Sequence, residues 1–222
     1  MRTFILAASA WLVVSGSAAA QTATPAAPAR TDFHAVIGWQ NLRQETGTAA
    51  FDSYNNWANG IFYGGAGAGW YWTEHAKVQV DVGAGTRGRH YRYRQLTING
   101  IQTSESARVA IQQRSVAVSQ QYQFFENQWF HPRVGIGADI AREERTEEFQ
   151  PVFTYDPVAR TSRLVSPART VGPSHRTIVR PFGEVGIKAY MTERAFFTGD
   201  ARVMFRGGID EILFRLGFGV DF

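Results

Sequence analysis

The chain has 222 residues, no cysteine, 14% aromatic residues and a formal net charge of +4 at neutral pH. This length suits a single domain, and the lack of cysteine excludes disulfides, thiolate metal ligands and lipid attachment through cysteine. The positive excess is too small to indicate a nucleic-acid-binding protein.

The first twenty residues have the features of a secretory signal peptide. Arg2 supplies the positive start, Phe4–Val14 the apolar stretch, and Ala18–Ala20 a cleavage site of small residues. We therefore expect a signal peptide over residues 1–20, a loosely ordered Pro/Ala-rich lead over 21–31, and one domain over 32–222. Beyond the signal peptide the sequence contains no apolar run long enough for a transmembrane helix.

Three short polar turns, each flanked by aromatic residues, divide the domain. They lie at Thr73–Ala76, Glu126–Gln128 and Thr192–Arg194, and they alternate with longer or glycine-marked connections. Short turns that alternate with longer loops are typical of outer-membrane barrels, with the turns in the periplasm. Eight strands are expected, with cores at 33–42, 60–72, 77–94, 105–124, 132–144, 176–191, 196–206 and 211–222.

The last segment, "ILFRLGFGVDF", places a large apolar residue at every second position, which is the period of a strand. A soluble β-sandwich and a membrane barrel give the same pattern on one strand. Across the chain, however, the face opposite the apolar residues carries glycines and isolated charges, which suit the narrow polar interior of an eight-stranded barrel. The fold class predicted is all-β: an eight-stranded antiparallel up-and-down transmembrane β-barrel with short periplasmic turns and longer extracellular loops.

Aromatic residues gather around the three short turns, where a barrel contacts the membrane interface. The expected girdle comprises Trp70, Trp72, Phe124, Trp129, Phe130, Tyr190 and Phe196.

Over residues 32–222 the chain resembles the small OmpA/OmpX-type outer-membrane β-barrel domain family. The resemblance rests on the strand count, the turn asymmetry, "GWYWTEHAKVQVDVG" and the closing "LGFGVDF". It implies a bacterial outer-membrane location after export, and an assembly signal at Phe218, Val220 and Phe222 that the barrel assembly machinery recognises. It does not identify a function, because such barrels host adhesion, anchoring, solute passage and lipid chemistry.

Charged residues on the inward-facing positions predict an ion-pair network in the lumen. A tight turn at Gly208-Ile209 would place Arg202 opposite Arg215 and Arg206 opposite Glu211. The turn between strands six and seven would bring Glu184 or Lys188 opposite Arg202 or Asp200. The network is either a salt-bridged plug or a gated conduit, and the narrow interior favours the plug. Its predicted members are Asp81, Asp139, Glu184, Lys188, Asp200, Arg202 and Arg215.

Strands three and four are longer than a membrane requires, which predicts a sheet that projects beyond the bilayer. A three-residue bulged turn over Ile98–Gly100, with Gly100 in the left-handed conformation, would pair Val82 with Val116 and Val80 with Val118. That register would place five basic residues on one outward face above the apolar belt, as lipopolysaccharide contacts or as a solvated basic edge. They are His90, Arg92, Arg94, Arg108 and Arg114.

The leading interpretation is a non-enzymatic outer-membrane barrel whose external loops contact lipopolysaccharide, a surface or another protein. A narrow channel or transporter for small solutes is the first alternative, and a lipid-modifying enzyme is the second. The nearest match to a lipid A deacylase is His175 and Thr177, followed by Glu184. Thr replaces the nucleophilic Ser, so no catalytic residue is expected. The sequence has no His-x-x-x-His or His-Glu-x-x-His pair, so no metal site is expected, and no cofactor is expected either. The expected partners are outer-membrane lipid and lipopolysaccharide, with no nucleic acid.

Overall fold

The computed structural model describes residues 31–43, 52–53, 57–98, 100–124, 129–156 and 158–222. The predicted signal peptide and residues 21–30 of the lead lie outside these described residues. Among the described residues, no helix has the length and apolar character needed to cross a membrane. The strands are β1 (Thr31–Arg43), β2 (Asp52–Ser53), β3 (Trp57–Tyr71), β4 (Ala76–Gly85), β5 (Gly88–Ile98), β6 (Ile101–Gln123), β7 (Phe130–Phe149), β8 (Val152–Asp156), β9 (Thr161–Ser166), β10 (Arg169–Tyr190), β11 (Ala195–Phe205) and β12 (Ile209–Asp221).

These strands form a closed ring of eight antiparallel positions, in which β4 and β5 together make one interrupted strand. Around the ring the order is β1, β3, β4 with β5, β6, β7, β10, β11 and β12, and β12 returns to pair with β1. The predicted eight-stranded antiparallel barrel is therefore confirmed. No predicted strand core extends more than one residue beyond the strand observed.

The alternation along β1 shows how the barrel wall is built. Phe33, Ile37 and Trp39 point outward, each more than half exposed, whereas Asp32 and His34 are buried inside. Apolar side chains thus face lipid and polar side chains face the lumen, which is the arrangement of a membrane barrel. At the end that carries the short turns, Trp70, Trp72 and Trp129 are likewise exposed, as a membrane-interface girdle requires.

Two members of the predicted girdle point into the barrel rather than toward the membrane. Phe196 is 1% exposed, and its ring centroid lies 4.0 Å from the Lys188 ammonium inside the barrel. The hydroxyl of Tyr190 donates a hydrogen bond to Asp221. The prediction was wrong for both because it relied only on their proximity to a turn. The alternation along β10 and β11 places both side chains on the inward face.

The junction between β4 and β5 contains a bulge that the sequence prediction placed elsewhere. Val82 pairs with Val116 as expected, but Ile98 pairs with Ile101, so two residues rather than three separate the strands at the hairpin tip. Gly100 does have a positive φ of 79°. The extra residue lies between Ala84 and Gly88, where three residues of this strand oppose two of β6.

Local contacts fix this bulge against β3. The amide of Thr86 donates to the carbonyl of Phe62 at 2.7 Å, and the amide of Phe62 donates to the Thr86 hydroxyl at 3.0 Å. At Gly88 a Cβ would lie 2.5 Å from Ile61 Cδ1, so a larger residue there would force the Ile61 side chain to move. One inserted residue reverses the facing of every residue beyond it.

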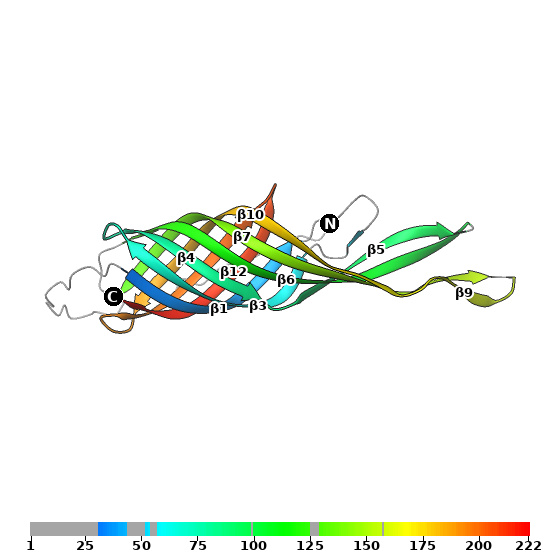
Figure 1. Ribbon diagram of the computed structural model, residues 1–222, viewed down its shortest axis with the longest axis horizontal. Coiled ribbons are helices and arrows are strands. Elements are labelled where there is room, and N and C mark those ends of the chain that lie inside the picture. The colour runs from blue at the N-terminus through cyan, green and yellow to red at the C-terminus, as the bar shows by residue number, and fades with distance from the viewer. Residues whose placement is uncertain (1–30, 44–51, 54–56, 99, 125–128, 157) are drawn as a thin grey trace, which may run out of the picture.

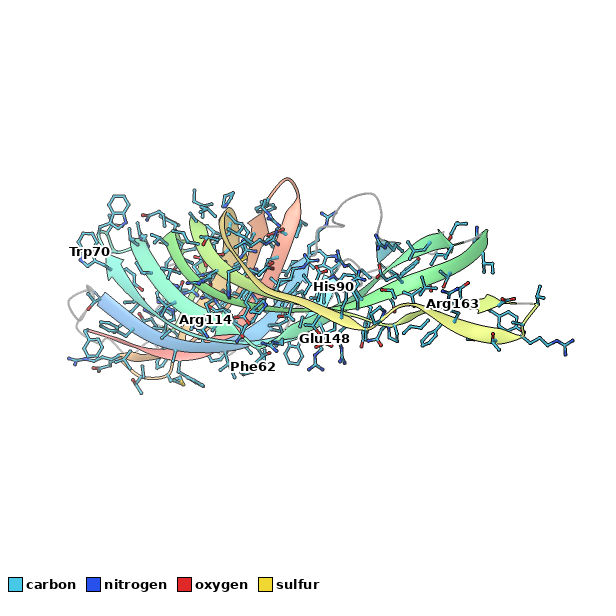
Figure 2. The ribbon with its side chains drawn as sticks, turned by 45° about the vertical axis from the view of Figure 1, so that its right-hand side comes forward. Phe62, Trp70, His90, Arg114, Glu148 and Arg163 are labelled. Atoms are coloured by element: carbon cyan, nitrogen blue, oxygen red, sulfur yellow. The ribbon has the colours of Figure 1, made fainter. Side chains whose placement is uncertain are left out.

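Beyond the bulge, β5, β6, β7 and β10 continue as one sheet past the ends of the other barrel strands. We call this part, together with the separate two-stranded β8–β9 hairpin, the surface sheet. Its described residues are 88–98, 100–111, 143–156 and 158–178. Figure 1 shows the barrel at one end of an elongated molecule, with the β5–β6 and β8–β9 hairpins projecting from the other end. In Figure 2, Trp70 and Arg163 mark opposite ends, and Arg114 lies between them.

Candidate functional site in the lumen and on the surface sheet

The periplasmic end of the lumen holds a lower ion cluster, formed by Asp32, Lys77, Lys188 and Asp221. Lys77 donates to Asp32 at 2.7 Å, and Lys188 donates to Asp221 at 2.6 Å. Tyr71 also donates its hydroxyl proton to Asp32 at 2.9 Å. Both lysines are at most 1% exposed, so each buried ammonium has a carboxylate partner, as burial of charge requires.

A middle ion cluster lies above it, formed by Asp81, Glu184, Asp200, Arg202 and Arg215. Arg202 donates to Glu184 at 2.6 Å and also to Asp81. Arg215 donates two hydrogen bonds to Asp200, at 2.8 and 3.0 Å. These five side chains come from four strands, so the cluster ties opposite walls of the barrel together.

Two further side chains complete the middle ion cluster. Arg133 on β7 donates to Asp200 at 2.8 Å, and His34 on β1 lies 2.8 Å from Asp81. Each of these carboxylates therefore has more than one partner. Networks with such shared partners hold their members in one geometry, because moving one group leaves others unpaired in a low-dielectric interior.

An upper ion cluster is centred on Arg180, which contacts Asp139, Asp210 and Glu211. The distances are 2.6 Å to Asp139, 3.0 Å to Asp210 and 2.8 Å to Glu211. Gln40 donates to Glu211 at 2.8 Å. Arg180 is 1% exposed, and three carboxylates surround it.

Apolar side chains occupy the levels between and above these clusters. One buried apolar group comprises Val36, Tyr63, Ala117, Phe182, Met204 and Leu213. A second group, at the surface-sheet end, comprises Leu42, Ala58, Ile61, Val109 and Ile111. Ions and hydrocarbon thus alternate along the barrel axis, and large buried side chains occupy the cross-section at successive levels.

The structure places all seven predicted lumen residues inside the barrel and gives each an ion-pair partner, but one predicted register is wrong. Arg202 lies opposite Glu184 on β10, which was one of the expected pairings. On β12, however, Arg202 lies opposite Leu213, and Arg215 lies opposite Asp200. The turn is centred one residue earlier than predicted, because Gly207, with φ of 70°, takes the left-handed position.

Seven ionic members of the lumen clusters were not predicted, although several could have been. Arg180 lies four residues before Glu184 on the same strand, so the alternation that places Glu184 inward also places Arg180 inward. Asp32 was missed because the first strand was begun one residue too late. The complete set of missed residues is Asp32, Lys77, Arg133, Arg180, Asp210, Glu211 and Asp221.

The expectation that five basic residues share one outward face is wrong. The bulge between β4 and β5 turns His90, Arg92 and Arg94 to the inward side of the surface sheet, where Arg92 pairs with Glu147 and Arg94 donates to Glu105 at 2.7 Å. The other two, Arg108 and Arg114, remain on the outward side.

His90 is buried in the surface sheet and lies near positively charged side chains. Its side chain is 7% exposed, and its Nδ1 atom has no hydrogen-bond partner among the described residues. Burial, with the nearby positive charges of Arg145 and Arg92, lowers the pKa of His90 from its usual 6.5 to about 4. The imidazole is therefore neutral at physiological pH.

The residues nearest to a deacylase pattern are not brought together. His175 and Thr177 are exposed on the outer face of β10, opposite Glu144 and Arg142 of β7. Glu184, the expected acid, is buried in the lumen and engaged with Arg202. These residues form no common site.

The C-terminal residues close the barrel seam. Phe218, Val220 and Phe222 point outward, and their side chains are 60%, 40% and 65% exposed. The amide of Phe222 donates to the carbonyl of Thr31 at 2.9 Å, at the end of the β1–β12 pairing. The role of these residues as an assembly signal stays a prediction.

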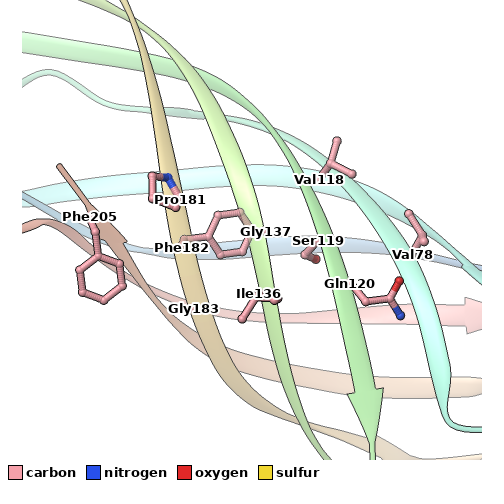
Figure 3. Close-up of a pocket in the computed structure, with 10 residues that line it drawn as sticks. All are labelled: Val78, Val118, Ser119, Gln120, Ile136, Gly137, Pro181, Phe182, Gly183 and Phe205. Carbon is pink, nitrogen blue, oxygen red and sulfur yellow. The ribbon is translucent and has the colours of Figure 1, made fainter.

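An apolar groove crosses the outer wall of the barrel within the lipid-facing belt (Figure 3). Two rows of outward side chains border it, and the backbone of the intervening residues forms its floor. Its volume is about 670 Å³. The lining residues are Val78, Val118, Ser119, Gln120, Ile136, Gly137, Pro181, Phe182, Gly183 and Phe205.

No protein-family model matches this chain, and no curated protein matches it in sequence. Among solved structures, Neisserial surface protein A (NspA) superposes with a TM-score of 0.51 and 13% identity, covering 86% of this chain and 97% of that one. OprG from Pseudomonas aeruginosa gives a TM-score of 0.50 and 13% identity, covering 87% of this chain and 97% of that one. This chain has the fold of a small outer-membrane barrel. The apolar outer wall and polar lumen fit this fold.

Proposed function

We propose that this protein is a non-enzymatic surface-interaction protein, in which a filled barrel anchors the surface sheet in the outer membrane. The observation that carries the proposal is the exposed apolar face at the tip of the β8–β9 hairpin. Phe153, Tyr155 and Leu164 are each about half exposed there, far from the lipid-facing belt. Contiguous exposed apolar groups outside a membrane are typical of contact sites for other surfaces or proteins.

The surface sheet holds this tip in a defined position. Phe153 lies opposite Leu164 in the hairpin, and the Thr103 hydroxyl on β6 donates to the Phe153 carbonyl at 3.0 Å. At the base of the hairpin, Arg169 donates to Glu105 at 2.8 Å, and its guanidinium carbon lies 4.3 Å from the centroid of the Phe149 ring. A tip fixed to β6 in this way loses less conformational entropy on contact than a free loop would.

Lipopolysaccharide is the other partner that we propose, because the outward arginines of β6 and β7 lie where the barrel leaves the bilayer. Contacts there would seat the barrel among the surface lipids and hold the surface sheet upright. A channel function is less favoured by the filled lumen, and an enzymatic function is less favoured by the separation of His175 and Thr177 from Glu184.

Adhesion of cells that display the protein tests the proposal. Replacing Phe153, Tyr155 and Leu164 together by Ser should reduce attachment to apolar-coated and cell-monolayer surfaces to the level of cells that lack the protein. The matched control is Thr154→Ser with Arg163→Ser, which changes the opposite face of the same hairpin. Attachment that persists in the first variant, at equal surface display, would contradict the proposal.

A further inference from the structure

Two arginines lie directly opposite each other on the outer face of the barrel. Arg114 of β6 pairs in register with Arg142 of β7, and both side chains are exposed. Like charges that face each other across an antiparallel pair repel and destabilise the sheet, unless a counter-charge lies between them. Within the part of the chain that the structure describes, neither guanidinium takes part in a hydrogen bond or an ion pair.

Two neighbouring outward arginines on this face lie near a carboxylate. Arg87 lies 3.6 Å from Glu144 of β7. Further out, Arg108 lies 3.8 Å from Glu148, with its guanidinium carbon 5.8 Å from the centroid of the Tyr91 ring. Arg89 of β5 is exposed on the same face and also has no ion pair among the described residues, but it lies opposite Ala110. The Arg114–Arg142 pair is therefore distinguished by two guanidinium groups that face each other without a counter-ion.

The depth of the pair identifies the kind of counter-ion that is available there. The next outward residues toward the membrane are Val116 and Ile140, which are 45% and 52% exposed and face lipid. Arg114 and Arg142 therefore lie at the first position above the hydrocarbon belt, on the side from which the surface sheet projects. In the outer leaflet that level holds the phosphate groups of lipid A.

The groove in the outer wall, which spans β4, β6, β7, β10 and β11, includes residues of the same two strands below the pair. Val118 on β6 and Ile136 on β7 line it, four and six residues from Arg114 and Arg142. At about 3.3 Å per residue these separations are roughly 13 and 20 Å, within the reach of an acyl chain attached to a bound head group. Gly183, beside Ile136 in the groove, has open space where a side chain would project.

We propose that Arg114 and Arg142 form a phosphate clamp for lipid A, with an acyl chain of the same molecule in the groove beneath. Two guanidinium groups bind one phosphate with charge-assisted hydrogen bonds, which a single Lys or Arg cannot match. The clamp deepens the proposed function by naming the site and the lipid group that it binds. Arg142 was not among the predicted lipopolysaccharide contacts.

Native mass spectrometry of the intact protein tests the clamp. The membranes from which the protein is released contain an equimolar mixture of bisphosphorylated and dephosphorylated lipid A. The parent should retain the bisphosphorylated form about tenfold more than the dephosphorylated form, equivalent to about 1.4 kcal/mol. The variant Arg114→Gln with Arg142→Gln should lose this preference. Arg108→Gln, at the compensated position, should keep it.

Three outcomes would overturn the clamp: a preference that survives in the double variant, a parent with no preference, or displacement of lipid A by millimolar inorganic phosphate. Phosphatidylglycerol, offered in a separate arm, should not replace lipid A, and replacement would also overturn the assignment. Adhesion through the β8–β9 tip is measured on the same variants. If the tip variant loses adhesion but keeps the lipid preference, the clamp is supported and adhesion through the tip is assessed separately. If the double arginine variant loses the lipid preference but keeps adhesion, the proposed adhesion function is unaffected.

Discussion

Arg202 of β11 and Glu184 of β10 face each other in the barrel lumen, joined by a hydrogen bond of 2.6 Å, and each side chain is 1% exposed. The same guanidinium also contacts Asp81 of β4, on the other side of the interior. This pair therefore belongs to a network that crosses the barrel.

Removing both partners should destabilise the barrel less than the sum of the two single removals. Arg202→Gln or Glu184→Gln strips a buried ion of a partner, and such changes typically cost about 3–5 kcal/mol, less where water reaches the site. In urea unfolding of the reconstituted protein, the double variant should lose less than the sum of the two single losses, with a coupling free energy of roughly 0.5–3 kcal/mol.

The control cycle is Arg108 with Glu148, whose side chains are 37% and 49% exposed. Its coupling free energy should be near zero, because solvent screens such pairs. Additive losses for Arg202 and Glu184 would show that the two do not interact.

Removal of the terminal aromatic residue should impair assembly. Deleting Phe222, or replacing it by Asp, removes an apolar group from the β1–β12 seam and from the predicted recognition element. We expect less heat-modifiable, folded protein in membrane fractions. Phe153→Asp, on the β8–β9 hairpin outside the barrel, should assemble normally. Equal folded yields for Phe222→Asp and the parent would refute the assembly role.

The bulge between β4 and β5 determines which residues the surface sheet presents. Because the natural chain has no cysteine, single cysteines report the facing directly. Tyr91→Cys should react rapidly with a membrane-impermeant maleimide, and His90→Cys slowly, since these residues are 57% and 7% exposed. Deleting Arg87 removes the extra residue and should reverse this order. If the order is unchanged by the deletion, the bulge does not set the facing.

Acidification should loosen the surface sheet around His90. Its pKa is about 4 in the folded protein and 6.5 in an unfolded chain, so the folded state binds fewer protons between these values. Stability should therefore be complete near pH 7 and should fall as pH drops from about 6.5 toward 4. Hydrogen exchange of β5 amides measures this loss.

His90→Gln should remove this part of the pH dependence, whereas His175→Gln, at an exposed position, should leave it intact. Because carboxylates in general also titrate near the lower end of this range, the comparison is between variants at each pH. An identical pH profile for His90→Gln and the parent would exclude His90 as the cause.

Period-two alternation in the sequence was enough to predict the ring of strands and the inward facing of residues such as Asp81 and Arg215. It could not predict the register across the β11–β12 turn, because a shift of two residues keeps every side chain on the same face. Only the left-handed conformation at Gly207 decides between the two registers.

The facing of β5 was mispredicted for a related reason. One extra residue is needed to bring Val82 opposite Val116, and the pattern does not show where along the strand it lies. Gly85 and Gly88 were available as a signal, since paired glycines within a strand often mark a bulge. Placing the bulge at the hairpin tip instead put His90, Arg92 and Arg94 on the wrong face.

The central claim is that the lumen is a salt-bridged plug rather than a conduit, and single-channel recording in planar bilayers tests it most directly. The parent protein should give no stepwise conductance in symmetric salt. Arg202→Ser with Glu184→Ser and Phe182→Ala removes both ionic and apolar filling, and should produce steps. Regular, voltage-stable steps from the parent, abolished when the barrel is unfolded by heating, would contradict the claim and establish a channel.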